Sequence, residues 1–254
     1  MSLVSKNETV APGALVEFAE FESLMDSAPV DKKDFLIPKL LLMQSTSGNV
    51  KEEKARVGEI RSSTSGKKIT EKEGTVEIIG FAPFKTWVVL KKQGGEFLEQ
   101  FPITPENASL PREQVKDGVV VNNYETLNYY CLLTEEIKSG LCSPYMVSFR
   151  STGYTAGKAM ETKRAMLKGR GIPISFMTFN LGSAPKKNDS GSFYVFTITE
   201  GRSSTADELR AVKPWNDLVK VGDVAVDHDA EFTAPKEVPS FEHVAEVQYE
   251  GHDY

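Results

Sequence analysis

Pro144-Tyr-Met-Val-Ser-Phe-Arg150 opens the stretch that decides the fold, and its β-branched and aromatic residues are typical of a strand. Gly153 to Gly171 has a helical pattern and carries most of the local charge. Ile172-Pro-Ile-Ser-Phe-Met-Thr-Phe-Asn-Leu181 alternates apolar and polar residues, which predicts a half-buried strand. Lys186-Lys-Asn-Asp-Ser-Gly191 predicts a turn, and Ser192-Phe-Tyr-Val-Phe-Thr-Ile198 predicts a second strand rich in aromatic rings.

Charge separates this stretch from the rest of the chain. From Arg150 to Lys187 there are eight basic residues and one acid, Glu161, in a chain whose formal net charge is −6. A single-stranded nucleic-acid groove needs cations that follow phosphates and aromatic faces that stack on bases. The alternative interpretation is a solvated basic helix beside strands whose aromatic rings form the core. The basic residues are Arg150, Lys158, Lys163, Arg164, Lys168, Arg170, Lys186 and Lys187.

Composition limits the classes of function. No apolar run approaches the ~20 residues of a membrane span, and the N-terminus lacks the segments of a secretory signal. We therefore expect a cytoplasmic protein without a membrane partner, whose cysteines Cys131 and Cys142 stay reduced. The three histidines, His228, His243 and His252, all lie near the C-terminus, which disfavours histidine-based catalysis and zinc binding. We expect neither an enzyme nor a cofactor.

Pattern and charge divide the chain into three parts. Residues 1–34 form an N-terminal segment with apolar spacing at 15–25 that predicts an amphipathic helix. Residues 35–222 are expected to form the folded domain. Residues 223–254 contain nine acids and one base without hydrophobic periodicity, and they predict a disordered acidic tail.

Further β-structure is expected before the opening stretch. Residues 75–91 are the strongest early β segment, and Gly80 and Pro83 in its middle predict a bulge or a sharp bend. Residues 92–125 have the composition of an insertion with short strand-like pieces. Residues 126–134 resume the β pattern.

The end of the folded domain and one glycine motif each suggest a specific structure. Residues 204–221 predict a C-terminal helix that Pro214 should kink or divide. The glycines Gly153 and Gly157, followed by Lys158, suggest a phosphate-binding loop. We reject it because the glycine spacing is one residue short and Ala159 supplies no hydroxyl for Mg²⁺.

The expected order is bent strand, strand, strand, helix, strand and strand. An OB-fold is a five-stranded Greek-key barrel with a helix between its third and fourth strands. With Ile-Pro-Lys-Leu-Leu-Leu-Met-Gln at 37–44 and an acidic tail that ends in an aromatic residue, this layout resembles single-stranded-DNA-binding proteins of tailed bacteriophages. The resemblance implies a mainly β, OB-fold-like five-stranded barrel with insertions and a C-terminal helix.

The resemblance also implies a function and partners. Such proteins coat single-stranded DNA in replication and recombination without sequence preference. Their acidic tails recruit replication or recombination proteins and compete with DNA for the basic groove. Asp253 and Tyr254 stand where related tails carry an acid and a terminal Phe. A phage-encoded chain would act in the host cytoplasm, and a homo-oligomer is compatible with this role.

Three hypotheses about function follow. In the first, the chain binds single-stranded DNA, with phosphates on the basic residues and bases on aromatic rings, about half of which must face the core. In the second, it is a protein-binding adaptor of the replication or transcription machinery that does not bind DNA. In the third, it is an enzyme on nucleic acid, but acids such as Glu59 and Glu77 lack metal-binding spacing. The candidate stacking residues are Trp87, Tyr154, Phe176, Phe179, Phe193 and Tyr194.

Overall fold

The computed structural model describes residues 36–188, 191–220 and 225–226. The predicted helix at 15–25 lies outside these residues, as do Asp253 and Tyr254. Within the predicted tail, Ala225 and Val226 form a short strand.

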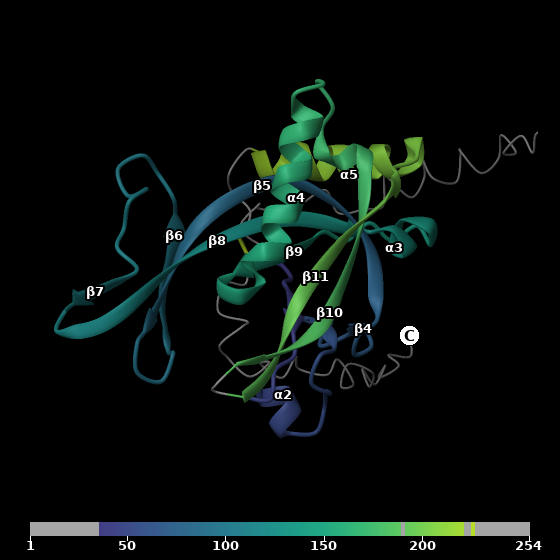
Figure 1. The fold of residues 1–254 in the computed structure, drawn as a ribbon. Helices are drawn as coiled ribbons and strands as arrows, with labels where there is room; N and C mark the ends of the chain where they lie inside the picture. Colours follow the sequence, from purple (N-terminus) through teal and green to yellow (C-terminus); the bar gives the residue numbers. More distant parts are fainter. Residues whose placement is uncertain (1–35, 189–190, 221–224, 227–254) are drawn as a thin grey trace, which may run out of the picture.

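The described residues form a mainly β body with helices, as the sequence predicts (Figure 1). The helices are α2 (Gly48–Lys51), α3 (Thr134–Lys138), α4 (Tyr154–Lys168) and α5 (Ala206–Lys220), with 3₁₀ turns at Ser151–Gly153 and Ile174–Phe176. The strands are β1 (Leu36–Ile37), β2 (Leu40–Leu42), β3 (Ile60–Ser62), β4 (Lys68–Thr70), β5 (Thr75–Lys91), β6 (Phe97–Pro102), β7 (Glu113–Lys116), β8 (Val119–Leu133), β9 (Tyr145–Arg150), β10 (Met177–Asn188), β11 (Gly191–Ser203) and β12 (Ala225–Val226).

One antiparallel sheet organises the body. Its strand order is β11-β10-β5-β8-β7, with β6 paired to β5 and β9 paired to β8. The β5–β8 ladder runs from Ile78↔Leu133 to Lys91↔Val121, with a register shift between Phe81 and Phe84. This shift confirms the irregularity predicted from Gly80 and Pro83, and Ala82 between them has a positive φ of 40°.

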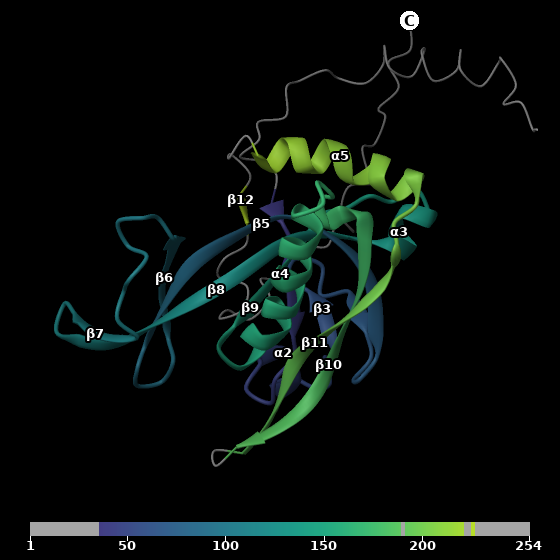
Figure 2. The same cartoon turned by 45° about the horizontal axis from the view of Figure 1, so that its top comes forward.

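The ends of β5 and β8 project from the body together with β6 and β7 (Figures 1 and 2). We call this projecting four-stranded part the arm. The predicted insertion at 92–125 therefore contains more β-structure than its composition suggests, and β8 begins at Val119 rather than at residue 126. Asp117 and Gly118 both have positive φ, which is the geometry of a tight hairpin turn between β7 and β8.

The gap between β9 and β11 is filled by the start of the described chain. Among the described residues, no ladder joins β9 to β11 directly. Instead, the Met146 N–H donates to the Pro38 carbonyl at 2.9 Å, and Lys39 forms a parallel bridge with Met146. The Gln44 side-chain amide bonds to both the N–H and the carbonyl of Tyr194, at 3.0 and 2.9 Å.

Hydrophobic clusters lie on both faces of the sheet because successive residues of β8 point to opposite sides. Tyr129 and Cys131 belong to the cluster that α4 covers with Met160. Tyr130 and Leu132 belong to the cluster that α5 covers with Val212 (Figure 2). Both cysteines are free, as predicted; Cys131 is buried and Cys142 is half-buried.

Two boundaries differ from the sequence-based expectation. The segment expected as a strand from residue 172 begins with the 3₁₀ turn, and its strand continues to Asn188, into the predicted turn. Helix α5 continues through Pro214 as one element and is not divided. Trp215 and Val219, beyond the proline, still pack on the sheet, and this packing offsets the lost helical hydrogen bond.

No helix of the described ranges is both long and apolar enough to cross a membrane.

An ion-pair network fixes the start of α5. Arg202 bonds to Glu208 at 2.6 and 2.9 Å and to Glu77 at 2.9 Å. The Thr205 N–H donates to Glu208 at 2.7 Å, and the Glu208 N–H donates to the Thr205 hydroxyl, a reciprocal cap. The hydrogen bonds from Arg202 lower the pKa of the buried Glu208 carboxyl to about 2, although burial opposes the charge.

We predict that Glu208→Gln destabilises the protein in a pH-dependent way. The folded-state pKa of Glu208 is depressed, so its contribution is fully present above the ordinary value of 4.5 and is lost as pH falls towards about 2. Because Arg202 remains partly in contact with water, we expect a loss of about 2 kcal/mol at pH 7. Denaturant unfolding between pH 7 and pH 2 measures this difference, with Asp207→Asn as the exposed control. Parallel pH curves for the wild type and Glu208→Gln would contradict the assignment.

Helix α4 packs closely on β9 at a glycine. A Cβ atom at Gly157 would lie 2.7 Å from Phe149 Cβ, whereas one at Gly169 would meet ordinary contacts of 3.6 Å or more. Where nothing obstructs the new methyl group, replacement of a helical glycine by alanine normally stabilises the folded protein by about 0.5–1 kcal/mol.

We therefore predict opposite signs for two alanine substitutions in this region. Gly157→Ala should destabilise by about 1–3 kcal/mol because α4 must move away from β9. Gly169→Ala should be neutral or slightly stabilising. Urea unfolding of both variants tests the prediction, and stabilisation by Gly157→Ala would refute the packing.

Candidate nucleic-acid interface

A cleft of about 470 Å³ lies where the arm meets the body. Residues of β5 and β8 form part of its lining, and the β6–β7 connection, the turn before α4 and the first residue of α4 supply the rest. The lining residues are Trp87, Leu110, Arg112, Asn123, Tyr124, Glu125, Ser151, Thr152 and Tyr154. The lining therefore combines three aromatic residues with one arginine and the hydroxyls of Ser151 and Thr152.

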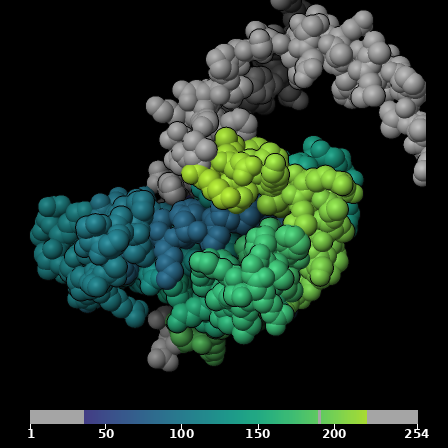
Figure 3. All heavy atoms as spheres, turned by 90° about the horizontal axis from the view of Figure 1, so that it is seen from above, coloured from purple at the N-terminus to yellow at the C-terminus, as the bar shows by residue number. Residues whose placement is uncertain are grey.

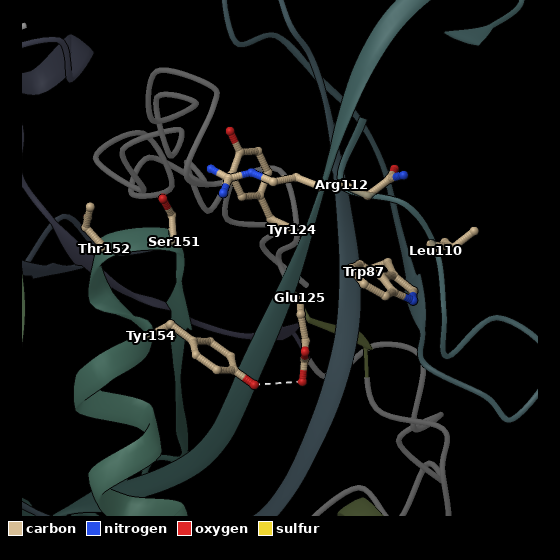
Figure 4. Close-up of a pocket in the computed structure, with 9 residues that line it drawn as sticks. Trp87, Leu110, Arg112, Tyr124, Glu125, Ser151, Thr152 and Tyr154 are labelled. Carbon is tan, nitrogen blue, oxygen red and sulfur yellow. Dashed lines mark hydrogen bonds between the residues drawn. The ribbon is translucent and has the colours of Figure 1, made fainter. Parts of the chain in front are cut away.

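Figure 4 shows how these side chains are arranged around the two strands. Tyr124 and Arg112 extend to the side of the strands on which Ser151 and Thr152 lie. Trp87 and Leu110 extend to the other side in this view. Tyr124 and Arg112 therefore face the turn before α4.

A hydrogen-bonded loop holds Trp87. Its indole N–H donates to the Asn107 carbonyl at 2.9 Å, and the ring is 7% exposed. The Asn107 side chain accepts from the Thr104 N–H at 2.8 Å and donates to the Pro102 carbonyl at 3.0 Å. One asparagine therefore fastens the connection between β6 and β7 over the indole.

Tyr154, the first residue of α4, contacts an ion pair across the cleft. Its hydroxyl donates to Glu125 Oε1 at 2.6 Å, and Lys85 Nζ lies 2.6 Å from the same oxygen. Burial opposes the charge of Glu125, but the hydrogen bonds from Lys85 and Tyr154 outweigh it and hold the pKa of that carboxyl below its usual value. Lys158 Nζ lies 5.4 Å from the centroid of the Tyr154 ring, within cation–π range.

One buried polar atom beside the cleft lacks a partner in the structure. The Asn123 amide nitrogen donates to the Pro111 carbonyl at 2.7 Å, and its backbone N–H donates to the Arg112 carbonyl at 2.8 Å. The Asn123 Oδ1 atom has no hydrogen-bond partner. These bonds attach the start of β7 to β8 and so position Arg112.

Two basic residues of α4 already have carboxylate partners. Lys163 Nζ lies 2.6 Å from Glu200 Oε2 on β11, and Arg164 Nε donates to both oxygens of Glu161 at 2.9 and 3.0 Å. The buried Tyr129 hydroxyl donates to Glu161 at 2.8 Å. The hydrogen bonds from Arg164, and then from Tyr129, lower the pKa of Glu161 despite burial. Lys163 and Arg164 therefore contribute less free positive charge than the sequence suggests.

The remaining predicted cations do not converge on one place. Lys158 is near the cleft through its contact with Tyr154, and Arg150 is half-buried at the end of β9, opposite Thr126 in the ladder. The others are exposed at the C-terminal end of α4 or near the end of β10; they are Lys168, Arg170, Lys186 and Lys187.

The predicted stacking residues divide between core and surface. Trp87 and Tyr154 both line the cleft, but Trp87 is only 7% exposed beneath the β6–β7 connection. Phe179 is 1% exposed in the core and does not present its ring to solvent. Phe176 is 45% exposed in the turn before β10. Phe193 is half-buried and lies opposite Lys186 in the β10–β11 ladder.

Tyr194 is held on both sides. Lys72 Nζ lies 5.5 Å from the ring centroid, and a Cβ atom at Gly58 would lie 2.7 Å from the ring. The Tyr194 hydroxyl contacts Glu73 at 3.3 Å. The Tyr194 ring therefore packs against these neighbours and is not free to stack on a base.

Sequence reasoning missed Arg112 and Tyr124 of the cleft lining, and also Lys85, which pairs with Glu125. Arg112 and Tyr124 lie in the predicted insertion and Lys85 lies in the predicted β segment at 75–91, all outside the basic stretch. The Asp117-Gly118 pair was an available signal, because this dipeptide between β-forming runs indicates a hairpin. A hairpin there would have placed Arg112 next to the strand that carries Tyr124.

Within the described residues, no group of three or more His, Cys, Asp or Glu side chains is arranged to hold a metal ion.

Comparison with known protein families assigns the chain to a family. A family model described as Pam3 phage gp34-like protein matches residues 6–225. The chain belongs to this family. No curated protein and no solved structure matches it. Membership of the gp34-like family indicates a phage protein, in agreement with the phage resemblance of the sequence, and leaves the ligand to be inferred from the cleft.

For this gp34-like chain we predict that Asn107→Ala loosens the connection over Trp87. Two side-chain hydrogen bonds are lost, and each normally contributes about 0.5–1.5 kcal/mol. In a Trp215→Phe background, which leaves Trp87 as the one tryptophan, its emission should shift to the red and acrylamide should quench it more strongly. Ser109→Ala, exposed in the same connection, is the matched control. Unchanged emission in the Asn107 variant would show that the two Asn107 side-chain hydrogen bonds do not order the β6–β7 connection.

Proposed function

We propose that this gp34-like protein binds single-stranded DNA without sequence preference, through the cleft between the arm and α4. The observation that carries the proposal is the meeting of Tyr124, Tyr154 and Arg112 at one open depression, flanked by Lys85 and Lys158. Aromatic faces stack on any base, and cations beside them follow the backbone.

The connectivity supports an OB-type domain as part of this proposal. Strands β5, β8 and β9, helix α4, and strands β10 and β11 follow each other in the OB order. The ladders β5–β8, β8–β9, β5–β10 and β10–β11 are four of the five pairs that such a barrel requires. The seam between the third and fifth strands is the departure, and residues 37–44 occupy it.

The position of the cleft fits this view. OB domains bind oligonucleotides with their second and third strands and with the loops that join strands one to two and four to five. Here the first of these loops corresponds to the arm, which lines the cleft with Leu110 and Arg112. The second corresponds to the end of the β10–β11 hairpin, where Lys186 and Lys187 are exposed. A strand that crosses β8 and β9 between these loops would pass Tyr124 and Arg150.

The adaptor hypothesis remains the second candidate because of the ion pairs on α4. Lys163 and Arg164 have carboxylate partners, so the basic helix is partly neutralised. In that case the acidic tail, residues 223–254, and the helix predicted at 15–25 would act on a protein partner, and the cleft would not bind DNA.

We predict that Arg112→Ala and Tyr124→Ala weaken DNA binding in distinguishable ways. Loss of the Arg112 cation should reduce the magnitude of the salt slope of affinity by about 1. Loss of the Tyr124 ring should cost about 1–3 kcal/mol of binding and leave the salt slope unchanged. Titration of fluorescent oligo-dT at several salt concentrations measures both quantities.

Arg210→Ala removes an exposed cation on α5 that pairs with Asp207, and it should leave binding unchanged. Absence of oligo-dT binding at low salt, even after removal of residues 227–254, would reject the DNA-binding proposal and favour the adaptor. That truncation keeps Ala225 and Val226, which pair with β1.

A further inference from the structure

The outer edge of the arm is a free strand edge. β7 pairs with β8 on one side, and among the described strands none pairs with its other side. Figure 3 shows the arm projecting away from the rest of the body. The unpaired N–H and C=O groups of such an edge are a template for another strand.

The same edge carries an exposed apolar row. Val115 is 70% exposed, and Val120, its partner in the β7–β8 ladder, is 39% exposed. Residues directly opposite in an antiparallel ladder lie on the same face of the sheet, so the two valines are neighbours on one face. Val119 and Leu98 are also exposed on the arm, at 40% and 39%. Half of the eight exposed large apolar side chains described thus lie on the arm.

Charges of the arm are largely balanced within it. Lys92 Nζ lies 2.7 Å from Glu113 Oε2, and Lys116 pairs with Glu99. Lys91 Nζ pairs with Glu96 at 2.6 Å. An arm whose cations already have acidic partners presents little net charge to a second arm, although the whole chain is acidic.

We propose that β7 pairs antiparallel with β7 of a second copy of this chain, around a two-fold axis at Val115. A two-fold axis perpendicular to a sheet passes between a residue and its own copy, so β7 allows four registers. Registers centred on Glu113 or Lys116 place like charges opposite each other. A register centred on Gln114 places Glu113 against Val115.

The register centred on Val115 fits the sequence best. It places Val115 opposite its copy and Gln114 opposite Lys116 of the second copy, a neutral polar group against a cation. On one face it aligns Val120 and Val115 with their copies, which gives four valines in a row across four strands. The contact is small, so the pairing is weak and depends on concentration.

Sedimentation velocity of the full chain over rising concentration tests the pairing. The average mass should rise from the monomer value of 28.1 kDa towards twice that value. Val115→Glu should remain monomeric over the same range, whereas Leu141→Glu, at an apolar residue 59% exposed elsewhere, should behave as wild type. A wild-type chain that stays monomeric up to ~1 mM, or a Val115→Glu variant that associates like wild type, would overturn the proposal.

Cross-linking tests the register. In a Cys142→Ser background, Val115→Cys places two thiols directly opposite each other at a separation that a disulfide spans. Gln114→Cys faces Lys116 of the second copy and should cross-link at least tenfold more slowly. Equal rates for the two variants would overturn the Val115-centred pairing. This pairing is independent of DNA, so its failure leaves the proposed function unaffected.

Discussion

The β5–β8 ladder is the constraint on which the rest of the structure depends. Its two strands carry both faces of the core at one end and continue into the arm at the other, from Ile78↔Leu133 to Lys91↔Val121. Antiparallel pairing over this length fixes which side chains of β8 face α4 and which face α5, because a slip of one residue would exchange the two sets. The irregularity between Phe81 and Phe84 bends the pair without breaking it, as a bulge does. The cleft, where the body ends and the arm begins, is set by the same two strands.

The sequence predicted the parts of this fold that depend on local pattern. The strand at 144–150, the helix that follows it and the mainly β class are confirmed, because hydrophobic period and glycine positions report on local structure. The arm was predicted only as short strand-like pieces because β6 and β7 are short and lie between turn residues, and their pairing with the long β5 and β8 is not visible in a local pattern. The extension of β10 through Asn188 has the same cause, because β11 pairs with it up to the hairpin.

The candidate site was predictable only in part. Trp87 and Tyr154 were identified from residue type, but alternation along a strand could not separate the buried Phe179 from the exposed Phe176. Nor could a count of basic residues reveal that Lys163 faces Glu200, which lies 37 residues away and is brought close by β11. Net charge along a sequence is therefore a poor measure of the electrostatic potential at a surface where acids from other strands lie beside the cations.

The Gln44 side chain takes the place of a strand at the seam between β9 and β11. Where a closed sheet would place a full ladder between β9 and β11, this body has one bridge at Lys39 and one side-chain amide that imitates a peptide group against Tyr194. Such a seam can part without the loss of a single pair from the long ladders. What holds β11 beside β9 is therefore mainly side-chain packing, such as the edge-to-face contact of Phe149 with Phe196 at a centroid distance of 5.8 Å.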